Sequence, residues 1–216
     1  MSLKFVLIGA GGHAVSITNI LHSNDNIVIN YVDNELAGKS IMGTPIITLK
    51  ECIDTYNDQN FCIAIGDNFI REKVSKEIRS LLPNAKFPAI THNSSVIGIK
   101  ATIGEGTVVM PQCNIGPRCS IGDFCIVNSN SSIDHDCDIL NFSSIAPGVN
   151  TGGNVKIGYR SAICIGSVIK QAITIGDDVV VGANSYVNKN LENNIIATGT
   201  PIKKHSDRKK GDSYLL

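Results

Sequence analysis

The sequence predicts a chain in two parts, a small Rossmann-like α/β domain followed by a parallel β-helix built from hexapeptide repeats. Two observations predict this. Short apolar runs alternate with amphipathic stretches over residues 1–92, and an unbroken six-residue period of Ile and Val occupies residues 97–192. The composition agrees, because 32 Ile and 20 Gly accompany only 11 Phe and Tyr and no Trp. A core of stacked aliphatic side chains is therefore expected.

The N-terminal part has the pattern of a βαβ-type unit with a parallel sheet. Buried strands are expected at 5–8, 27–32, 61–65 and 87–90, the last leading into the repeats. A helix follows the first strand and ends near Leu21. One face of a later helix is marked by Ile70, Val74, Ile78 and Leu81.

A glycine-rich turn follows the first strand at residues 9–14, where Gly-Ala-Gly-Gly-His-Ala fits the pattern G-x-G-x-x-A. With Asp33 about twenty residues further on, this is the dinucleotide-binding pattern, in which N–H groups at a helix N-terminus approach a diphosphate. A strand–helix turn without a ligand is the alternative. Because about ninety residues are half of a full dinucleotide domain, a mononucleotide or a sugar nucleotide is expected rather than NAD. His13, where the helix begins, is a candidate contact for that ligand.

The repeat begins at Ile97 and runs through sixteen hexads to Glu192 without an insertion. Fifteen of the sixteen first positions are Ile or Val, the exception being Thr151, whereas the composition would place three or four there by chance. A six-residue period suits a parallel β-helix, in which each hexad is a short strand and a turn. Three hexads would make one triangular coil, so the repeat spans slightly more than five coils.

Small residues occupy two other positions of the hexads. The second position is Gly in eight hexads, as expected where the chain must turn. The fifth position includes four of the seven cysteines, Cys113, Cys119, Cys125 and Cys137. These cysteines are expected to be buried spacers rather than metal ligands or disulfide partners.

The repeats contain a single histidine, His135, at the third position of its hexad. Its side chain is expected to point outwards near a corner of the coil. Two interpretations are open, a general base whose tautomer is fixed by Asp136 or Asp134, or a solvated surface residue. One histidine per chain does not suffice for a three-histidine metal site, so no metal is expected.

The charge balance limits the possible partners. Nineteen basic side chains cancel 19 acidic ones, which argues against nucleic acid or an anionic membrane surface. No apolar run approaches the roughly 18 residues of a membrane span, and no charged-then-apolar leader is present. A soluble, cytoplasmic protein is expected.

The hexads, the turn Gly9-Ala10-Gly11-Gly12-His13 and the segment from Asn128 to Asp136 resemble the hexapeptide-repeat acetyltransferases of bacterial glycan synthesis. The likeness is greatest to the sialic-acid O-acetyltransferase-like branch, which includes N-acetyltransferases of nucleotide-linked 4-amino-sugars. It extends from Lys4 to about Lys204. The resemblance implies a left-handed β-helix, acetyl-CoA as the co-substrate, and a homotrimer with active sites between subunits.

The resemblance also implies roles for individual residues. His135 matches the family's catalytic base, and Asp136 matches the acidic residue that follows it. The positions that match substrate-binding residues are Gly11, Gly12, His13, Asp33, Asn34, Gly66 and Asn128. The positions that match acetyl-CoA contacts are Ser144, Gly153, Ile165 and Ala183. Of these, Gly153 would bind the thioester carbonyl through its backbone N–H.

Three positions depart from the family's pattern. Asp136 stands where Glu is more usual, Ser144 where many members have a second His, and Asn34 where Asp is usual. The first departure alters the hold on His135, the second removes a cation from the cofactor site, and the third changes a contact to the nucleotide sugar.

The function implied by the resemblance is acetyl transfer from acetyl-CoA to the amine of a nucleotide-linked 4-amino-4,6-dideoxy sugar. The sugar would serve bacterial O-antigen, capsule or glycoprotein synthesis. Two alternatives remain open, O-acetylation of a sialic-acid-like sugar and a non-catalytic sugar-nucleotide-binding scaffold.

Three segments are expected along the chain. Residues 1–92 form the sugar-nucleotide-binding domain, 93–202 the β-helix acetyltransferase domain, and 203–216 a C-terminal tail. The tail holds five of the 19 basic residues. A solvated and mobile tail is expected, and an approach of its charges to the CoA phosphates is the alternative.

Overall fold

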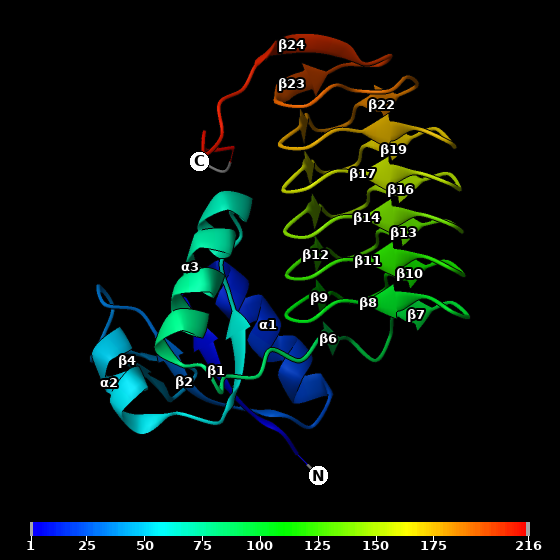
Figure 1. Ribbon diagram of the computed structural model, residues 1–216. Helices are drawn as coiled ribbons and strands as arrows, with labels where there is room; N and C mark the ends of the chain where they lie inside the picture. Colours follow the sequence, from blue (N-terminus) through cyan, green and yellow to red (C-terminus); the bar gives the residue numbers. More distant parts are fainter. Residues whose placement is uncertain (1, 215–216) are drawn as a thin grey trace.

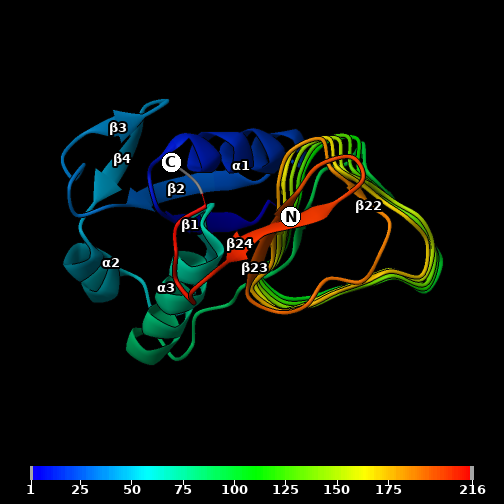
Figure 2. The ribbon, with the colours of Figure 1, turned by 90° about the horizontal axis from the view of Figure 1, so that it is seen from above.

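The computed structural model describes residues 2–214, which form an α/β layer standing beside a column of stacked coils (Figure 1). The column is a left-handed parallel β-helix, as expected. Seen along its axis, the coils superpose into a triangle, and the α/β layer lies along one of its sides (Figure 2). The two predicted parts are therefore packed against each other along much of the column.

The N-terminal sheet has five strands in the order β3-β4-β2-β1-β5. Their bounds are β1 Lys4–Ile8, β2 Ile27–Val32, β3 Ser40–Ile41, β4 Thr44–Ile47 and β5 Asn60–Ile63. The strands β1, β2, β4 and β5 are parallel, and β3 forms an antiparallel hairpin with β4. The prediction of three parallel strands is confirmed, whereas β3 and β4 were not predicted.

Alternate residues of β1 enter different clusters, so the sheet is covered on both faces. Phe5 and Leu7 pack with α1 (Gly12–Ser23), whereas Val6 and Ile8 pack with α3 (Asn68–Leu81). A short helix, α2 (Leu49–Thr55), was also not predicted; it begins with a capping box in which Thr48 and Glu51 exchange hydrogen bonds.

The predicted strand at 87–90 is shorter and lies elsewhere. The chain forms β6 at Ile90–Thr91, and this strand pairs with β9 of the column rather than with the N-terminal sheet. Phe87 is buried before it, in the cluster beneath α3. The apolar run was therefore identified correctly, but it divides between the two parts of the molecule.

Each hexad contributes one two-residue strand. These strands are β7 (Val96–Ile97), β8 (Thr102–Ile103), β9 (Val108–Val109), β10 (Asn114–Ile115), β11 (Ser120–Ile121), β12 (Ile126–Val127), β13 (Ser132–Ile133), β14 (Asp138–Ile139), β15 (Ser144–Ile145), β16 (Asn150–Thr151), β17 (Lys156–Ile157), β18 (Ala162–Ile163), β19 (Val168–Ile169), β20 (Thr174–Ile175), β21 (Val180–Val181) and β22 (Tyr186–Val187). Every third strand pairs in parallel, so that Ile121 lies beside Ile139 and Ile103, 18 residues away on either side. The three sheets of the triangle result, and the Ile and Val lattice fills its interior.

The corners show why particular hexad positions need particular residues. The left-handed conformation falls on the fourth position, with φ of 58° at Asp136 and 61° at Phe142. The glycines at the second position are not left-handed, so the expectation that they mark the turn is wrong. They are needed because the coils stack closely: a Cβ on Gly116 would lie 2.8 Å from backbone atoms of Asp134 and His135 in the next coil.

Aromatic rings lie outside the coils, where they join the two parts. Phe61, Phe87, Phe124, Phe142 and Tyr159 form a continuous row whose neighbouring centroids are 5.3 to 6.1 Å apart. The last three occupy the fourth position of successive coils or the position before it. The column therefore offers the α/β layer an aromatic edge, while its interior stays aliphatic.

The C-terminal segment is ordered, in contrast to the mobile tail that was expected. After β23 (Ile195–Thr198), β24 (Lys203–Asp207) returns antiparallel beside it at the end of the column. The chain then descends to α3, and Arg208 is only 7% exposed (Figure 1). Residues 203–214 thus reconnect the far end of the column to the N-terminal layer; 215 and 216 lie outside the described residues.

Candidate active site

His135 lies at an outer corner of the β-helix, between β13 and β14, and is 46% exposed. Its Nδ1 is 2.6 Å from Oδ2 of Asp136. Arg118, one coil away, donates to both oxygens of the same carboxylate from Nε and Nη2, at 2.6 Å each. A carboxylate can only accept, so the neutral ring carries its proton on Nδ1 and leaves the Nε2 lone pair free. Of the two carboxylates that could fix the tautomer, Asp136 is the one at Nδ1.

The Asp136 carboxylate is held ionised. The hydrogen bonds from Arg118 and then from His135 lower its pKa to about 2. Asp134 acts differently, because its Oδ1 accepts the backbone N–H of His135 at 2.7 Å. Asp136, held by Arg118, thus orients the imidazole, while Asp134 holds the backbone of His135, and none of these hydrogen bonds involves Nε2.

The ring of His135 lies against Gly153 in the next coil. A Cβ on Gly153 would approach His135 Nε2 and Cε1 to 2.6 Å. In the described part of the chain the Gly153 N–H meets no backbone acceptor. The half-exposed base nitrogen therefore lies against a buried glycine whose N–H meets no backbone acceptor. A base beside an N–H donor is the pair of groups that acyl transfer requires.

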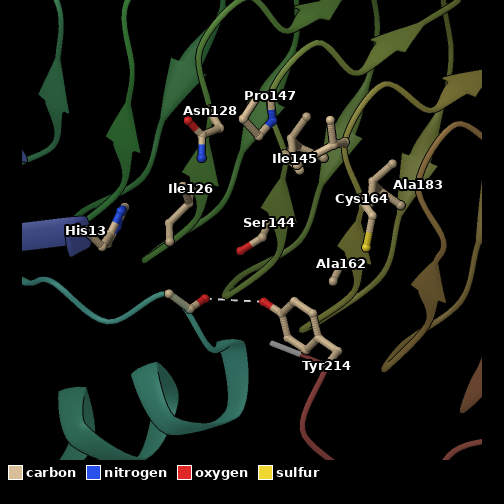
Figure 3. A pocket seen from close by; sticks show the side chains of 14 residues that line it. His13, Ile126, Asn128, Ser144, Ile145, Pro147, Ala162, Cys164, Ala183 and Tyr214 are labelled. Carbon is tan, nitrogen blue, oxygen red and sulfur yellow. Dashed lines mark hydrogen bonds between the residues drawn. The ribbon is translucent and has the colours of Figure 1, made fainter. Parts of the chain in front are cut away.

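Six other predicted site residues line a cavity of about 430 Å³ (Figure 3). They are His13, Gly66, Asn128, Ser144, Ile165 and Ala183. The floor is the sheet face at β12, β15 and β18, and the α/β layer closes one side. Asn128 accepts the Ser129 N–H through Oδ1, which leaves its amide nitrogen turned toward the cavity (Figure 3). The lining is otherwise mostly aliphatic.

The glycine turn places α1 with its N-terminus open. Gly9 has φ of 112° and lies so near Ala64 that a Cβ would be 3.0 Å from the carbonyl oxygen, so this position requires glycine. Gly11 is the N-cap of α1 and supplies no side-chain cap. A Cβ on Gly11 or Gly12 would meet nothing within 4 Å. The first N–H groups of the helix therefore face open space, the arrangement that binds anions.

His13 is half-buried at the edge of the cavity. Burial, together with the nearby charge of Arg71, lowers its pKa to about 4, so the ring is neutral at neutral pH. Its Nε2 is buried without a hydrogen-bond partner among the described residues. A buried polar atom of this kind is costly unless something bonds to it, which favours a ligand contact at this nitrogen.

Beneath the cavity lies Arg71 of α3, which is 1% exposed. Its guanidinium donates to four carbonyl oxygens, those of Ile65, Gly66, Phe124 and Phe142. It also donates to Asn68 Oδ1 at 2.6 Å and to Ser144 Oγ at 3.2 Å. One side chain thus joins the loop after β5 to one corner of the column in two successive coils.

Ser144, predicted as an acetyl-CoA contact, is engaged by this network. Its hydroxyl donates to Asn68 Oδ1 at 2.5 Å and accepts from Arg71. The single proton of the hydroxyl is therefore already committed within the protein.

Asp33 and Asn34 lie at a second cavity, of about 360 Å³, at the ends of β1 and β2. Asp33 Oδ1 accepts the N–H groups of Glu35 and Leu36, at 3.0 and 3.2 Å. Asn34 Oδ1 accepts the Leu49 N–H at the start of α2. One oxygen of Asp33 remains for a ligand, whereas the Asn34 oxygen shapes the loop.

The thirteen predicted residues thus fall into four places within one chain. His135, Asp136 and Gly153 lie together at a corner, six residues line the large cavity, Asp33 and Asn34 line the second one, and Gly11 and Gly12 lie at the N-terminus of α1. His135 does not line the large cavity. The base and the expected substrate cavity of a single subunit lie on different faces of the column.

Three residues of the site were missed from the sequence. Arg118 could have been found, because it precedes Asp136 by 18 residues and must stack on it in a three-hexad coil. Arg71 and Tyr214 carry no such signal. They reach the cavity only because α3 and the C-terminal segment pack against the column.

No cluster of three potential metal ligands occurs within residues 2–214. All seven cysteines are free, and burial raises the pKa of Cys62, Cys125 and Cys137, among others. The predicted role of the repeat cysteines as buried spacers agrees with the structure. None of the helices described here is long and apolar enough to cross a membrane.

The stacked hexads with an α/β layer beside them give this chain the fold of the hexapeptide-repeat acetyltransferases. Residues 4–78 match the PglD N-terminal domain, and residues 94–135 match the bacterial transferase hexapeptide repeats. The chain is homologous to nucleotide-amino-sugar acetyltransferases such as GDP-perosamine N-acetyltransferase. The resemblance seen in the sequence is thereby confirmed.

Several characterised proteins are similar over most of the chain. GDP-perosamine N-acetyltransferase of Escherichia coli O157:H7 is 29% identical over 184 residues, or 82% of each chain. A perosamine N-acetyltransferase of Caulobacter crescentus, solved with CoA and GDP-perosamine, superposes with a TM-score of 0.88 at 28% identity, covering 94% of this chain and 97% of the other. The acetyltransferase domain of PglB from Neisseria gonorrhoeae FA1090, solved with acetyl coenzyme A, gives 0.88 and 28%, with 95% and 100% covered.

Proposed function

We propose that this protein is an acetyl-CoA-dependent N-acetyltransferase that acts on the amine of a nucleotide-linked 4-amino-4,6-dideoxy sugar, in bacterial O-antigen, capsule or glycoprotein synthesis. The observation that carries the proposal is the His135 Nε2 lone pair beside the Gly153 N–H, which meets no backbone acceptor within residues 2–214. The Caulobacter and Neisseria relatives, which bind CoA, GDP-perosamine or acetyl coenzyme A, support it. Structures of the Caulobacter enzyme with one histidine replaced by Asn or Ala accord with a histidine base.

The reaction needs a base and an oxyanion donor. The sugar amine attacks the thioester carbonyl carbon while His135 Nε2 accepts the proton that the nitrogen loses. The Gly153 N–H donates to the carbonyl oxygen as negative charge develops on it. The carbon–sulfur bond then breaks, and the proton passes from His135 to the sulfur, which releases CoA and the acetamido sugar. Asp136 keeps the proton of Nδ1 in place throughout.

We propose that the working unit is a homotrimer in which His135 of one subunit faces the large cavity of the next. Two observations support this assembly. His135 and the cavity are on different faces of one subunit, so each face is incomplete alone. The sheet that carries His135 also exposes apolar side chains at Val96, Val168 and Tyr186, which a second subunit would cover.

We propose that the two expected domains have different roles in the reaction. Residues 1–92 would hold the nucleotide at the open end of α1 and near Asp33, and 93–202 would carry out the transfer. Gly66 and Asn128 would contact the sugar, and Ile165 and Ala183 the acetyl-CoA, in the cavity that they line. A cytoplasmic location is proposed with this, and the seven reduced cysteines support it.

The test is a thiol-release assay with acetyl-CoA and a panel of GDP-, UDP- and dTDP-linked 4-amino sugars. We expect turnover with at least one amine, and a fall of about 10²- to 10⁴-fold in kcat for His135→Ala. Near-normal turnover of His135→Ala would remove its role as base. The mass of the trimer is checked by light scattering, with monomer as the contradicting result.

The same panel separates the alternatives. Acetylation of a hydroxyl sugar but not of any amine would indicate the O-acetyltransferase. Tight nucleotide-sugar binding without thiol release would indicate the scaffold.

A further inference from the structure

The C-terminal segment 208–214 is fastened at its start by a buried arginine. Arg208 pairs with Asp178, with Nη1 at 3.7 Å from Oδ1 and at 3.3 Å from the backbone oxygen. The same Asp178 binds Arg160, which in turn binds Glu72 of α3. Arg208 is thus the last member of a buried chain of alternating charges that runs from α3 across the column to the C-terminal segment.

The segment is shaped by its own hydrogen bonds and by α3. Arg208 Nη2 donates to the Asp212 carbonyl at 2.5 Å, and the Lys209 N–H donates to Asp212 Oδ2 at 2.8 Å. Gly211 has φ of 87° and lies on Phe69, where a Cβ would come within 3.3 Å of the ring. These contacts direct the chain toward the large cavity.

The segment ends on Tyr214, which becomes a wall of that cavity (Figure 3). Its hydroxyl donates to the Gly66 carbonyl at 3.2 Å, and the Arg208 guanidinium lies 5.9 Å from its ring centroid. Burial raises the pKa of the hydroxyl, so it stays protonated and remains a donor to Gly66. Tyr214 therefore presents mainly its ring to the interior.

The polar atoms at this end of the cavity are already bonded within the protein. The Tyr214 proton goes to Gly66, and the Ser144 proton goes to Asn68. The neighbouring lining is aliphatic, from Ile126 and Ala162. A ligand hydroxyl placed here would lose its hydrogen bonds to water and find few replacements, whereas a methyl group would bury apolar surface.

We propose that Tyr214 is a specificity-determining residue for the acceptor, whose ring packs against the deoxygenated carbon of the sugar and selects 6-deoxy over 6-hydroxy acceptors. This rests on the proposed acetyl transfer to a nucleotide-linked amino sugar. The residues 208–213 are the support that holds the ring in place.

The experiment compares two acceptors, a nucleotide-linked 4-amino-4,6-dideoxy sugar and its 6-hydroxy counterpart, in the full-length protein. Wild type should prefer the 6-deoxy acceptor by roughly tenfold or more in kcat/KM. Tyr214→Ala should lose most of that preference and raise the KM for the 6-deoxy acceptor roughly tenfold, with a smaller change in kcat. Tyr214→Phe, which keeps the ring, should retain the preference.

Two controls separate the effect of the Tyr214 ring on selectivity from general effects of changing the C-terminal segment. Lys210→Ala alters an exposed side chain of the same segment and should leave both acceptors unaffected. Calorimetric binding of each acceptor, without acetyl-CoA, measures the same preference apart from turnover. Unchanged selectivity in a folded Tyr214→Ala protein would overturn the inference, as would increased activity with both acceptors, which indicates an inhibitory tail.

The outcome is separable from that of the proposed function. If wild type acetylates no amino sugar, the proposed function fails, and the binding preference still tests Tyr214. If wild type is active and Tyr214→Ala shows the wild-type preference, only the role of Tyr214 fails.

Discussion

The His135 ring rests on the backbone of Gly153 so closely that a methyl group on Gly153 would come within 2.6 Å of Nε2 and Cε1. The general base and the proposed oxyanion donor are therefore positioned by one contact between adjacent coils. Any side chain at position 153 must push the ring away from the N–H.

We therefore expect Gly153→Ala to lower kcat by about 100-fold or more, because a small displacement of a base is costly. The protein should remain folded, since the ring can rotate outward. The matched control is Gly158→Ala, whose Cβ would meet the backbone of Gly176 at 2.4 Å, far from His135. It should lower the melting temperature and leave kcat near the wild-type value. Equal kcat losses in the two variants would contradict the assignment.

A second prediction concerns the carboxylate behind His135. Asp136→Asn should lower kcat at least about tenfold, because an amide can hold the ring in the wrong tautomer. Arg118→Met should have a smaller effect, since Arg118 acts only through Asp136. The kcat of the double variant should be no lower than that of Asp136→Asn alone. Additive losses in a double-mutant cycle would contradict the claim that Arg118 acts only through Asp136. As the pKa of Asp136 is lowered to about 2, its protonation should not appear in the pH–rate profile above pH 4.

A third prediction concerns Arg71. Arg71→Lys keeps the charge but cannot reach four carbonyls and two side chains at once, so buried acceptors lose their donors. We expect the free energy of unfolding to fall by roughly 3 kcal/mol or more, measured with urea. On the same helix Arg79 is exposed and pairs with Glu105. Arg79→Lys should cost less than about 1 kcal/mol. Similar losses for both would show that the buried network adds little.

A fourth prediction follows from His13. Its pKa in the folded protein, about 4, lies below the ordinary 6.5, so between these pH values the unfolded chain binds a proton that the folded chain does not. The stability that His13 contributes is complete above pH 6.5 and is lost as the pH falls toward 4. Unfolding free energy should drop by on the order of 2 kcal/mol from pH 7 to pH 5, and this drop should be smaller in His13→Gln. The exposed His22 on the same helix provides the control, as His22→Gln should follow wild type. If the unfolding free energy of His13→Gln had the wild-type pH dependence, His13 would not be the source of the loss of stability at low pH.

The last prediction concerns the thiols. Cys164 lines the large cavity, whereas the other six cysteines are buried. Burial raises the pKa of Cys164, so it should react slowly with maleimides, and its modification should block the cavity and the activity. Acetyl-CoA should protect it. Cys164→Ala should keep activity within about twofold of wild type, because no cysteine acts as nucleophile, and maleimides should no longer inhibit it. A large loss of turnover in this variant would indicate a direct role of Cys164 in the reaction.

The sequence predicted the column well because its determinants are local and repeated. Each Ile or Val of the lattice specifies its own strand, and the 18-residue register then places Arg118 on Asp136 and His135 on Gly153. The α/β layer was predicted less completely. The hairpin β3–β4 has too few residues for a period, and α2 depends on the capping box at Thr48.

The cavity could not be assembled in the same way, since its walls come from distant segments without a common period. Arg71 looks like any polar helical residue in the pattern of α3, yet it is buried because one corner of the column presents carbonyls to it from two successive coils. Tyr214 belongs to a segment whose charges suggested a solvated tail. It is ordered because Arg208 finds Asp178 on the column, a pairing that only the folded chain reveals.

Because the coils repeat every 18 residues, the length of each coil determines which residues stack on one another at the site. A deletion of one hexad between His135 and Gly153 would move every later residue to the next side of the triangle. Gly153 would then no longer lie against His135. A deletion of a whole coil would preserve every face but shorten the path by which β24 and Arg208 return to α3. Length changes in this column are therefore tolerable only in whole coils, and even then they are limited by the reach of the C-terminal segment.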